Sequence, residues 1–137
     1  MKTYPLLQSQ LAVFLQCMEH PTSTQYNLPS YVPLSQTIDV KRLEDAVQRV
    51  FKERRELRTR FVIDDNGEVR QWWDDDMTLD IVHRKSTNEE AMNYILNEFT
   101  RPFDLLSGEP LFRFELWETE KGIYLLVDGD GGEACTR

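Results

Sequence analysis

Cysteine, histidine and glycine are scarce in this chain of 137 residues, which has 2 cysteines, 2 histidines and 6 glycines. Cys17 and Cys135 form no CxxC pair and fit no zinc-ligand spacing. So few thiols favour a reduced, intracellular setting. The sequence shows no sign of a metal site or of a tightly bound cofactor, and we expect neither.

Long apolar runs are also lacking. No stretch approaches the roughly 20 apolar residues that span a bilayer. Polar residues such as Gln8 and Gln16 interrupt the apolar positions near the N-terminus, so this region does not resemble a signal peptide. Internal repeats, low-complexity segments and Gly/Ser linkers are absent as well. We therefore expect one cytoplasmic domain.

Positive charge is in short supply, with 16 Lys and Arg against 24 Asp and Glu, for a net charge of -8. An acidic surface repels phosphate groups, so neither nucleic acid nor an anionic membrane is an expected partner. The charge alone names no other partner, because an acidic balance also serves solubility.

Apolar periodicity predicts three helices. The first has its apolar face at Leu7, Leu11, Phe14, Leu15 and Met18 and ends before Pro21. The second is capped by Asp39, with apolar positions from Leu43 to Phe51. The third begins with Thr87 and Glu90 as a capping box and ends before Pro102.

Extended segments separate these helices. Asn66-Gly67 predicts a hairpin turn in which both residues tolerate positive φ. Pro29 and Pro33 confine the segment from 25 to 34 to a sheet edge or to an irregular strand. The other predicted strands are Thr59–Ile63, Glu68–Trp73, Thr78–His83, Phe112–Glu118 and Ile123–Val127. The pattern predicts an α+β fold in which about three helices pack on a mainly antiparallel sheet.

Four segments, in order along the chain, resemble motifs of the condensation domains of nonribosomal peptide synthetases. They are Tyr4–Gln10, Tyr26–Pro29, Glu56–Phe61 and Arg101–Arg113. The resemblance implies that residues 1–127 form the N-terminal lobe of a chloramphenicol-acetyltransferase-like fold. Residues 128–137 are expected to be a disordered or non-native tail.

The resemblance also implies what the chain does not carry. In this family the strand corresponding to Ile123–Val127 leads into an HHxxxDG motif, whose second histidine is catalytic. The aligned place here holds Gly129, Asp130 and Gly131. His20 and His83 do not match the motif, so we expect no catalytic residue and no activity from the chain alone.

Two matches imply binding roles. Gln10 corresponds to a glutamine that the first motif places near the start of the first helix. Arg58 corresponds to an arginine that pairs with the motif aspartate. With that aspartate lacking, we expect Arg58 to be exposed or paired elsewhere; the alternative is a surface arginine in a basic cluster with Arg54, Arg55 and Arg60.

Three functions fit these observations. The first is a truncated part of a condensation domain, whose parent joins a carrier-bound acyl or aminoacyl thioester to an acceptor amine. Its partners would be carrier-protein domains bearing phosphopantetheine, and its open apolar surface would favour self-association. The second is a non-catalytic module that docks a carrier protein or another partner through a basic patch. The third is part of an acyltransferase of the same superfamily that uses coenzyme A thioesters.

Overall fold

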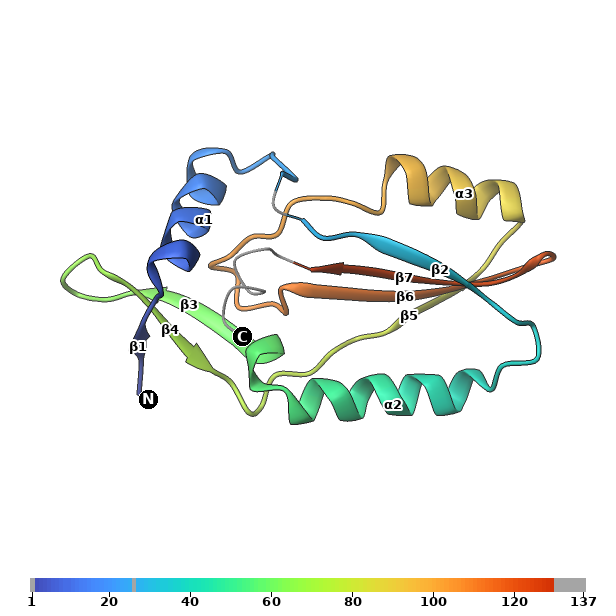
Figure 1. Cartoon of the computed structure of the whole chain (residues 1–137), viewed down its shortest axis with the longest axis horizontal. Coiled ribbons are helices and arrows are strands. Elements are labelled where there is room, and N and C mark those ends of the chain that lie inside the picture. The colour runs from blue at the N-terminus through green and yellow to red at the C-terminus, as the bar shows by residue number, and fades with distance from the viewer. Residues whose placement is uncertain (1, 26, 130–137) are drawn as a thin grey trace.

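The computed structural model describes residues 2–25 and 27–129 and contains two sheets and three α-helices (Figure 1). The helices are α1 (Gln8–Glu19), α2 (Val40–Glu53) and α3 (Asn88–Asn97), with a short 3₁₀ helix η1 at Arg55–Arg58. The strands are β1 (Tyr4–Pro5), β2 (Ser30–Leu34), β3 (Thr59–Ile63), β4 (Val69–Trp73), β5 (Val82–Lys85), β6 (Phe112–Thr119) and β7 (Gly122–Gly129). The fold is therefore α+β, as expected.

The larger sheet has the strand order β2-β7-β6-β5. Strands β2, β7 and β6 pair antiparallel, whereas β5 pairs parallel to β6. Side chains alternate between the two faces of a strand, and each face packs on one helix. Phe114 of β6 packs with Phe51 of α2 on one face, and Leu126 of β7 packs with Ala91 of α3 on the other. Figure 1 accordingly shows α2 and α3 on opposite sides of this sheet.

The smaller sheet has the order β1-β4-β3 and is antiparallel throughout. Helix α1 covers one of its faces, where Phe14 packs against Phe61 with the two ring centroids 5.3 Å apart. Leu105 and Leu111, from the loop before β6, complete this second core. That loop therefore joins the two sheets at the end where β6 begins.

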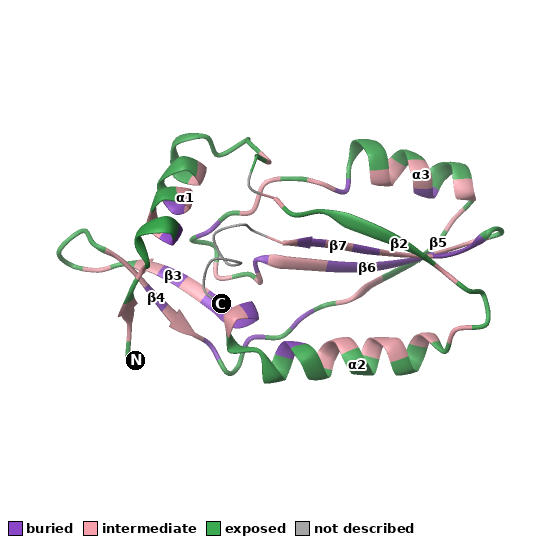
Figure 2. Cartoon of the chain, in the orientation of Figure 1, coloured by how far each residue is buried: buried purple, intermediate pink, exposed green. Residues whose placement is uncertain are grey.

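Most predicted elements are confirmed, and the helix caps, the edge position of β2 and the burial of apolar side chains account for them. Asp39 caps α2 by accepting a hydrogen bond from the backbone N–H of Arg42 at 3.2 Å. Thr87 caps α3 in the same way through Glu90 N–H at 3.1 Å. Strand β2 lies at the edge of the larger sheet, as its prolines required. Figure 2 shows the buried residues gathered along β6, β7 and the inward sides of the helices.

The strand predicted over 78–83 is displaced. It begins at Val82 and pairs parallel to β6. Met77 and Leu79 are buried in the core without strand pairing, and Gln48 of α2 donates a hydrogen bond to the carbonyl of Leu79 at 2.7 Å. The apolar alternation there reflects burial under α2 rather than a sheet.

The predicted hairpin is confirmed, since β3 and β4 pair antiparallel across the turn, where Gly67 has positive φ, at 78°, and Asn66 does not. The end of the last strand differs from the sequence prediction. Strand β7 continues through Asp128 and Gly129, so these two residues belong to the sheet and not to a tail that starts at 128. The remaining expected tail, 130–137, lies outside the described residues.

Candidate functional site

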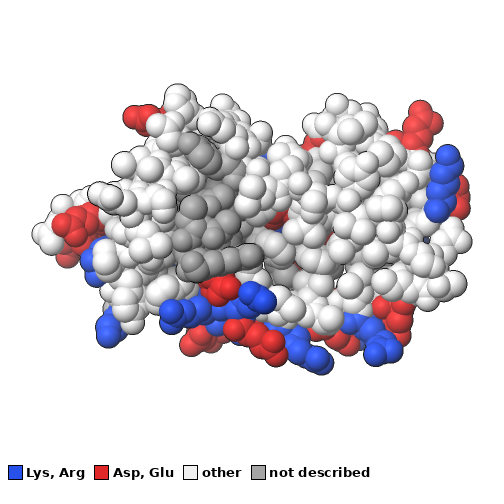
Figure 3. Space-filling model, in the orientation of Figure 1, with Lys and Arg blue, Asp and Glu red and all other residues white. Residues whose placement is uncertain are grey.

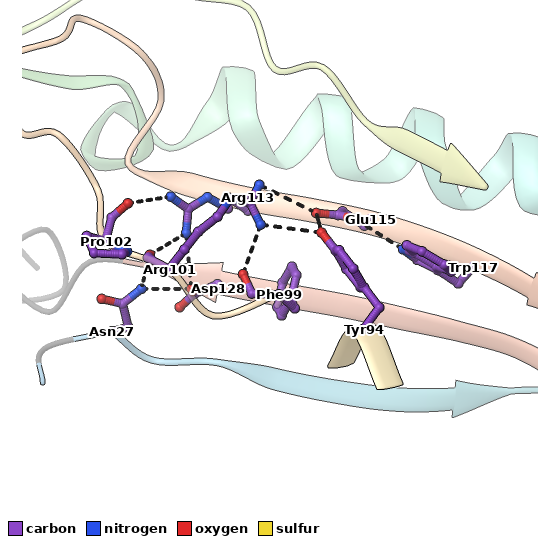
Figure 4. A network of polar contacts seen from close by, with 9 residues as sticks. All are labelled: Asn27, Tyr94, Phe99, Arg101, Pro102, Arg113, Glu115, Trp117 and Asp128. Atoms are coloured by element: carbon purple, nitrogen blue, oxygen red, sulfur yellow. Dashed lines mark hydrogen bonds and ion pairs between the residues drawn. The ribbon is translucent and has the colours of Figure 1, made fainter. Parts of the chain in front are cut away.

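A buried polar network lies where β6 begins and β7 ends (Figure 4). Asp128 of β7 is 0% exposed and pairs across the sheet with Arg113 of β6. A guanidinium nitrogen of Arg113, Nη1, lies 3.4 Å from Asp128 Oδ2. The side chain of Asn27, which precedes β2, donates a hydrogen bond to the same carboxylate oxygen at 2.8 Å. Three separate segments thus converge on one carboxylate.

Arg113 also holds the loop that follows α3. Its Nη1 donates to the carbonyl of Arg101 at 2.7 Å, and its Nη2 donates to the carbonyl of Pro102 at 2.8 Å. The guanidinium lies over the ring of Phe103, 3.8 Å from its centroid. A planar fork of donors suits such a set of acceptors, which a lysine would not satisfy. The Arg101-Pro102-Phe103 segment is therefore fixed to the end of the larger sheet.

A second part of the network joins α3 to β6. Glu115 is 3% exposed and accepts hydrogen bonds from Tyr94 at 2.9 Å and from the indole N–H of Trp117 at 3.1 Å. The rings of Tyr94 and Trp117 stack with centroids 4.4 Å apart. Arg101 donates to the Tyr94 hydroxyl at 3.3 Å and to the carbonyl of Phe99 at 2.9 Å. These contacts make Arg101 the link between the two halves of the network.

Burial dominates the electrostatics of this network. Burial raises the pKa of Asp128, while the hydrogen bond from Asn27 and the charge of Arg113 oppose that rise. Burial, followed by the nearby charge of Arg101, lowers the pKa of Arg113, which still stays cationic because arginine holds its proton in proteins. The pKa of Tyr94 is raised by burial and then by Glu115, so the phenol stays a neutral donor at neutral pH. The other oxygen of Asp128, Oδ1, is buried without a hydrogen-bond partner among the described residues.

Arg58 is buried and paired, so the expectation of an exposed surface arginine is wrong, and that of pairing elsewhere is confirmed. It is 7% exposed. Its Nη1 donates to the carbonyl of Lys52 at 3.2 Å, and its Nη2 lies 3.5 Å from a carboxylate oxygen of Asp75, which is itself 91% exposed. Its Nε is buried with no partner among the described residues. This guanidinium therefore has one weakly placed countercharge.

The basic cluster expected around Arg58 is divided by acidic partners. Arg60 forms an ion pair with Asp74 at 2.6 Å, and Arg54 lies 3.7 Å from Glu56. Figure 3 shows Lys and Arg interleaved with Asp and Glu along the edge formed by α2 and η1. The cluster is thus a mixed surface and not a uniform basic patch.

Gln10 is fully buried and holds α1 on the smaller sheet. Its amide exchanges two hydrogen bonds with the amide of Gln71 on β4, at 2.8 and 3.3 Å. Its oxygen also accepts the backbone N–H of Leu7 at 3.2 Å. The structure thus gives Gln10 a helix-anchoring place, and a ligand contact for Gln10 stays a prediction.

Neither histidine joins the network. His20 follows α1, and His83 of β5 lies 3.5 Å from carboxylate oxygens of both Glu44 and Glu118. Within residues 2–25 and 27–129, no group of three or more His, Cys, Asp or Glu could hold a metal ion. Over the same residues, no helix is long and apolar enough to cross a membrane. Among the described residues the network contains no histidine, and its contacts with the carbonyls of Arg101 and Pro102 fix backbone positions.

The sequence prediction missed Asn27, Arg113 and Asp128 as one site. Asn27 and Arg113 lie inside the motif segments, but the resemblance implies no role for either, and Asp128 lies at the start of the expected tail. One signal was available: Asp128 follows five apolar residues of a strand, and an acidic residue in such a place needs a buried partner. Nothing in the sequence named that partner.

Comparisons with known proteins agree on one family. The family model of the condensation domain matches residues 1–129. Curated relatives include tyrocidine synthase 2 of Brevibacillus parabrevis, 33% identical over 90% of this chain, and surfactin synthase subunit 1 of Bacillus subtilis, 31% identical over 83% of it. The chain spans 3% of the length of each of these relatives.

Solved structures agree with the fold. The starter condensation domain of rhizomide synthetase superposes with a TM-score of 0.84 at 22% identity, covering 96% of this chain and 33% of that one. The first condensation domain of the calcium-dependent antibiotic synthetase superposes with a TM-score of 0.77 at 17% identity, covering 94% and 34%. The fold and the site thus define a lobe of the chloramphenicol-acetyltransferase-like class. The chain belongs to the condensation domains of nonribosomal peptide synthetases and corresponds to about a third of a solved domain.

Proposed function

We propose that this chain supplies the N-terminal lobe of a condensation domain that joins an acyl or aminoacyl thioester to an acceptor amine. The buried network of Asn27, Arg113 and Asp128 carries the proposal. It fixes the end of β7, the strand that in this family leads into the HHxxxDG motif. A catalytic group must be held within a fraction of an ångström of its working position, and a strand end anchored from three sides provides that support.

The general base is not part of the described site. Amide formation needs a group that takes or positions the proton of the attacking amine. His83 pairs in register with Leu116, three positions along β6 from Arg113, so it lies on the order of 10 Å along the strand from the pair of Arg113 and Asp128. The lobe therefore acts as the scaffold for a catalytic motif and not as its source.

Arg58 supports the same assignment. Its Nε has no partner within the described chain, and its one carboxylate neighbour faces solvent. A buried cation with so little compensation is unfavourable on its own, and a carboxylate from outside the described residues would improve its pairing. The family's motif aspartate is such a group.

The donor and its carrier follow from the family. The donor is a thioester on the phosphopantetheine arm of a carrier-protein domain, and the acceptor amine is carried in the same way. A mutant of one solved neighbour, the starter condensation domain of rhizomide synthetase, was determined in complex with C8-CoA. A coenzyme A thioester therefore belongs in the test as an alternative donor. It tests the hypothesis of an acyltransferase that uses coenzyme A thioesters.

The experiment compares two proteins. One is this chain alone, and the other is this chain joined at Gly129 to the following residues of a condensation domain of tyrocidine synthase 2. Each is incubated with an acyl thioester donor, on a carrier or on coenzyme A, and with an aminoacyl thioester acceptor, and the amide is measured by mass spectrometry. We expect product from the joined protein and none above background from the chain alone.

Two results would contradict the proposal. One is saturable amide formation by the chain alone. The other is a joined protein that is folded and monomeric, binds its carriers and still makes no amide. Circular dichroism and size-exclusion chromatography distinguish a joined protein that fails to fold from one that folds and is inactive.

A further inference from the structure

Strand β2 forms one edge of the larger sheet, and its outer side is open. In the part of the chain that the structure describes, only β7 pairs with this strand. Figure 2 shows β2 as exposed along most of its length. Tyr31 and Val32 are 47% and 45% exposed. An exposed edge strand with large apolar side chains is a ready site for pairing with another chain.

The register of β2 decides which backbone groups face this open side. The amide of Leu28 donates to the carbonyl of Gly129 on β7, and the register from that bond to the end of β2 is continuous. Along an antiparallel strand, the backbone groups of successive residues point alternately toward the partner strand and away from it. The backbone groups of Pro29, Tyr31 and Pro33 therefore point to the open side.

Two of these three outward positions cannot donate a hydrogen bond. Proline has no N–H, so the open side presents the carbonyls of Pro29, Tyr31 and Pro33 but only the N–H of Tyr31. A strand that paired here would leave its own carbonyls without donors opposite both prolines. Polar groups that lose water and gain no partner oppose association. The prolines thus flank the one position at which a complete pair of hydrogen bonds can form.

A second copy of the lobe meets this obstacle twice. Two β2 strands related by a two-fold axis run antiparallel, and when Tyr31 lies opposite its counterpart, Pro29 of one copy lies opposite Pro33 of the other. Only the two Tyr31 residues can then exchange hydrogen bonds, because neither proline has an N–H. A shift of the register by two residues places Tyr31 opposite a proline, and such a pair keeps a single hydrogen bond.

We propose that Pro29 and Pro33 close the edge of β2 to strand pairing, so that the lobe does not extend its larger sheet with a second copy of itself. The exposed apolar side chains at Tyr31 and Val32 make such a barrier necessary. The inference is independent of the proposed function, since it concerns contact between copies and not amide formation.

The test compares the 137-residue chain with Pro29→Thr/Pro33→Thr by size-exclusion chromatography with light scattering over a range of concentrations. Threonine restores an N–H at each position and favours extended backbone. We expect the double variant to self-associate with a dissociation constant at least about tenfold lower than that of the unchanged chain. Pro21→Thr is the control. This exposed proline follows α1 and lies outside both sheets, so its replacement should leave association within about twofold.

Tyr31→Lys identifies the surface through which the double variant associates. In the symmetric pairing the two new ammonium groups lie opposite each other, so this change should return the double variant to the behaviour of the unchanged chain. In the unchanged chain, Tyr31→Lys should leave any association through other surfaces within about twofold. Equal association of the double variant and the unchanged chain would overturn the proposal. So would a loss of association when Tyr31→Lys is made in the unchanged chain, because the edge would then already be in use.

Hydrogen exchange in the unchanged chain tests the proposal without any variant. The N–H of Tyr31 points to the open side, whereas that of Val32 points to β7. We expect the amide of Tyr31 to exchange at least about tenfold faster than that of Val32. Equal protection of the two amides would show that another strand covers the edge and would contradict the proposal. Circular dichroism establishes that each variant in the association experiment is folded.

Discussion

Replacing Arg113 with methionine tests the network most severely. Methionine keeps an apolar stem over Phe103 but removes the charge and all five donors. The carbonyl of Pro102 then loses its Arg113 donor, and the fully buried carboxylate of Asp128 keeps the hydrogen bond from Asn27 but loses the adjacent guanidinium. Breaking a buried ion pair costs about 3–5 kcal/mol. Since the Arg113 side chain is 17% exposed and the pair is 3.4 Å apart, we expect a loss near the lower limit, about 3 kcal/mol.

The loss should depend on pH, and its sign follows from the raised pKa of Asp128. The folded pKa lies above the ordinary value of 3.8, so between the two values the native state binds more protons than the unfolded state. Stability therefore decreases as pH rises through that window. Arg113 is one of the groups that lower this pKa, so its removal extends the window upward. Arg113→Met should consequently destabilise less near pH 4 than at pH 7.

The assay is urea unfolding followed by tryptophan fluorescence, with Asp128→Asn and the double variant completing a cycle. We expect the double variant to lose less than the sum of the two single variants, with a coupling of about 1–2 kcal/mol. A loss below about 1 kcal/mol for Arg113→Met, or an equal loss at both pH values, would refute the idea that a buried charge is being compensated. So would additivity of the two changes.

Three further predictions concern the chain alone and use the same unfolding assay. Gln10→Ala should cost about 1–3 kcal/mol because it leaves buried polar groups without partners, whereas Gln16→Ala on the exposed side of the same helix should stay within about 0.5 kcal/mol; equal losses would contradict the buried amide pair. Gly108→Ala should lower the free energy of unfolding more than Gly67→Ala. Both glycines have positive φ, but only at Gly108 would the added Cβ meet a side chain, that of Arg60 on β3. Tyr94→Phe should cost about 1 kcal/mol at pH 7. It should also reduce the loss of stability above pH 10, because a phenol whose pKa is raised in the folded protein lowers the free energy of unfolding as pH rises through that range. An unchanged alkaline stability profile would contradict this prediction.

The helices were predictable because their signals are local. Asp39 and Thr87 each cap a helix by accepting a hydrogen bond from a residue three positions further along the chain. The apolar spacing along α2 marks the face that packs on the sheet. The limits of the strands were less predictable. Met77 and Leu79 are buried by contact with α2, and no local pattern separates that case from a strand.

The site was predictable only in part. The motif segments placed the family and selected Arg58 and Gln10, but the structure shows both of these side chains buried, and it shows Arg58 paired with Asp75. The network at the end of β7 joins Asn27 to Asp128 across 101 positions in sequence. A single sequence does not reveal which distant polar residues meet, because that depends on strand order and register.

The central claim is that this network holds the end of β7 in place, and hydrogen exchange at Leu28 tests it most directly. The amide of Leu28 donates to the carbonyl of Gly129 at 2.8 Å, so it reports on the strand end. We predict that Arg113→Met speeds exchange at Leu28 by at least about tenfold more than at Phe61 in the other sheet. In the unchanged protein, local opening at Leu28 must break the contacts of Arg113, whereas in the variant these contacts are already lost. Equal changes at Leu28 and Phe61 would show that the strand end is held by the sheet alone and would contradict the account.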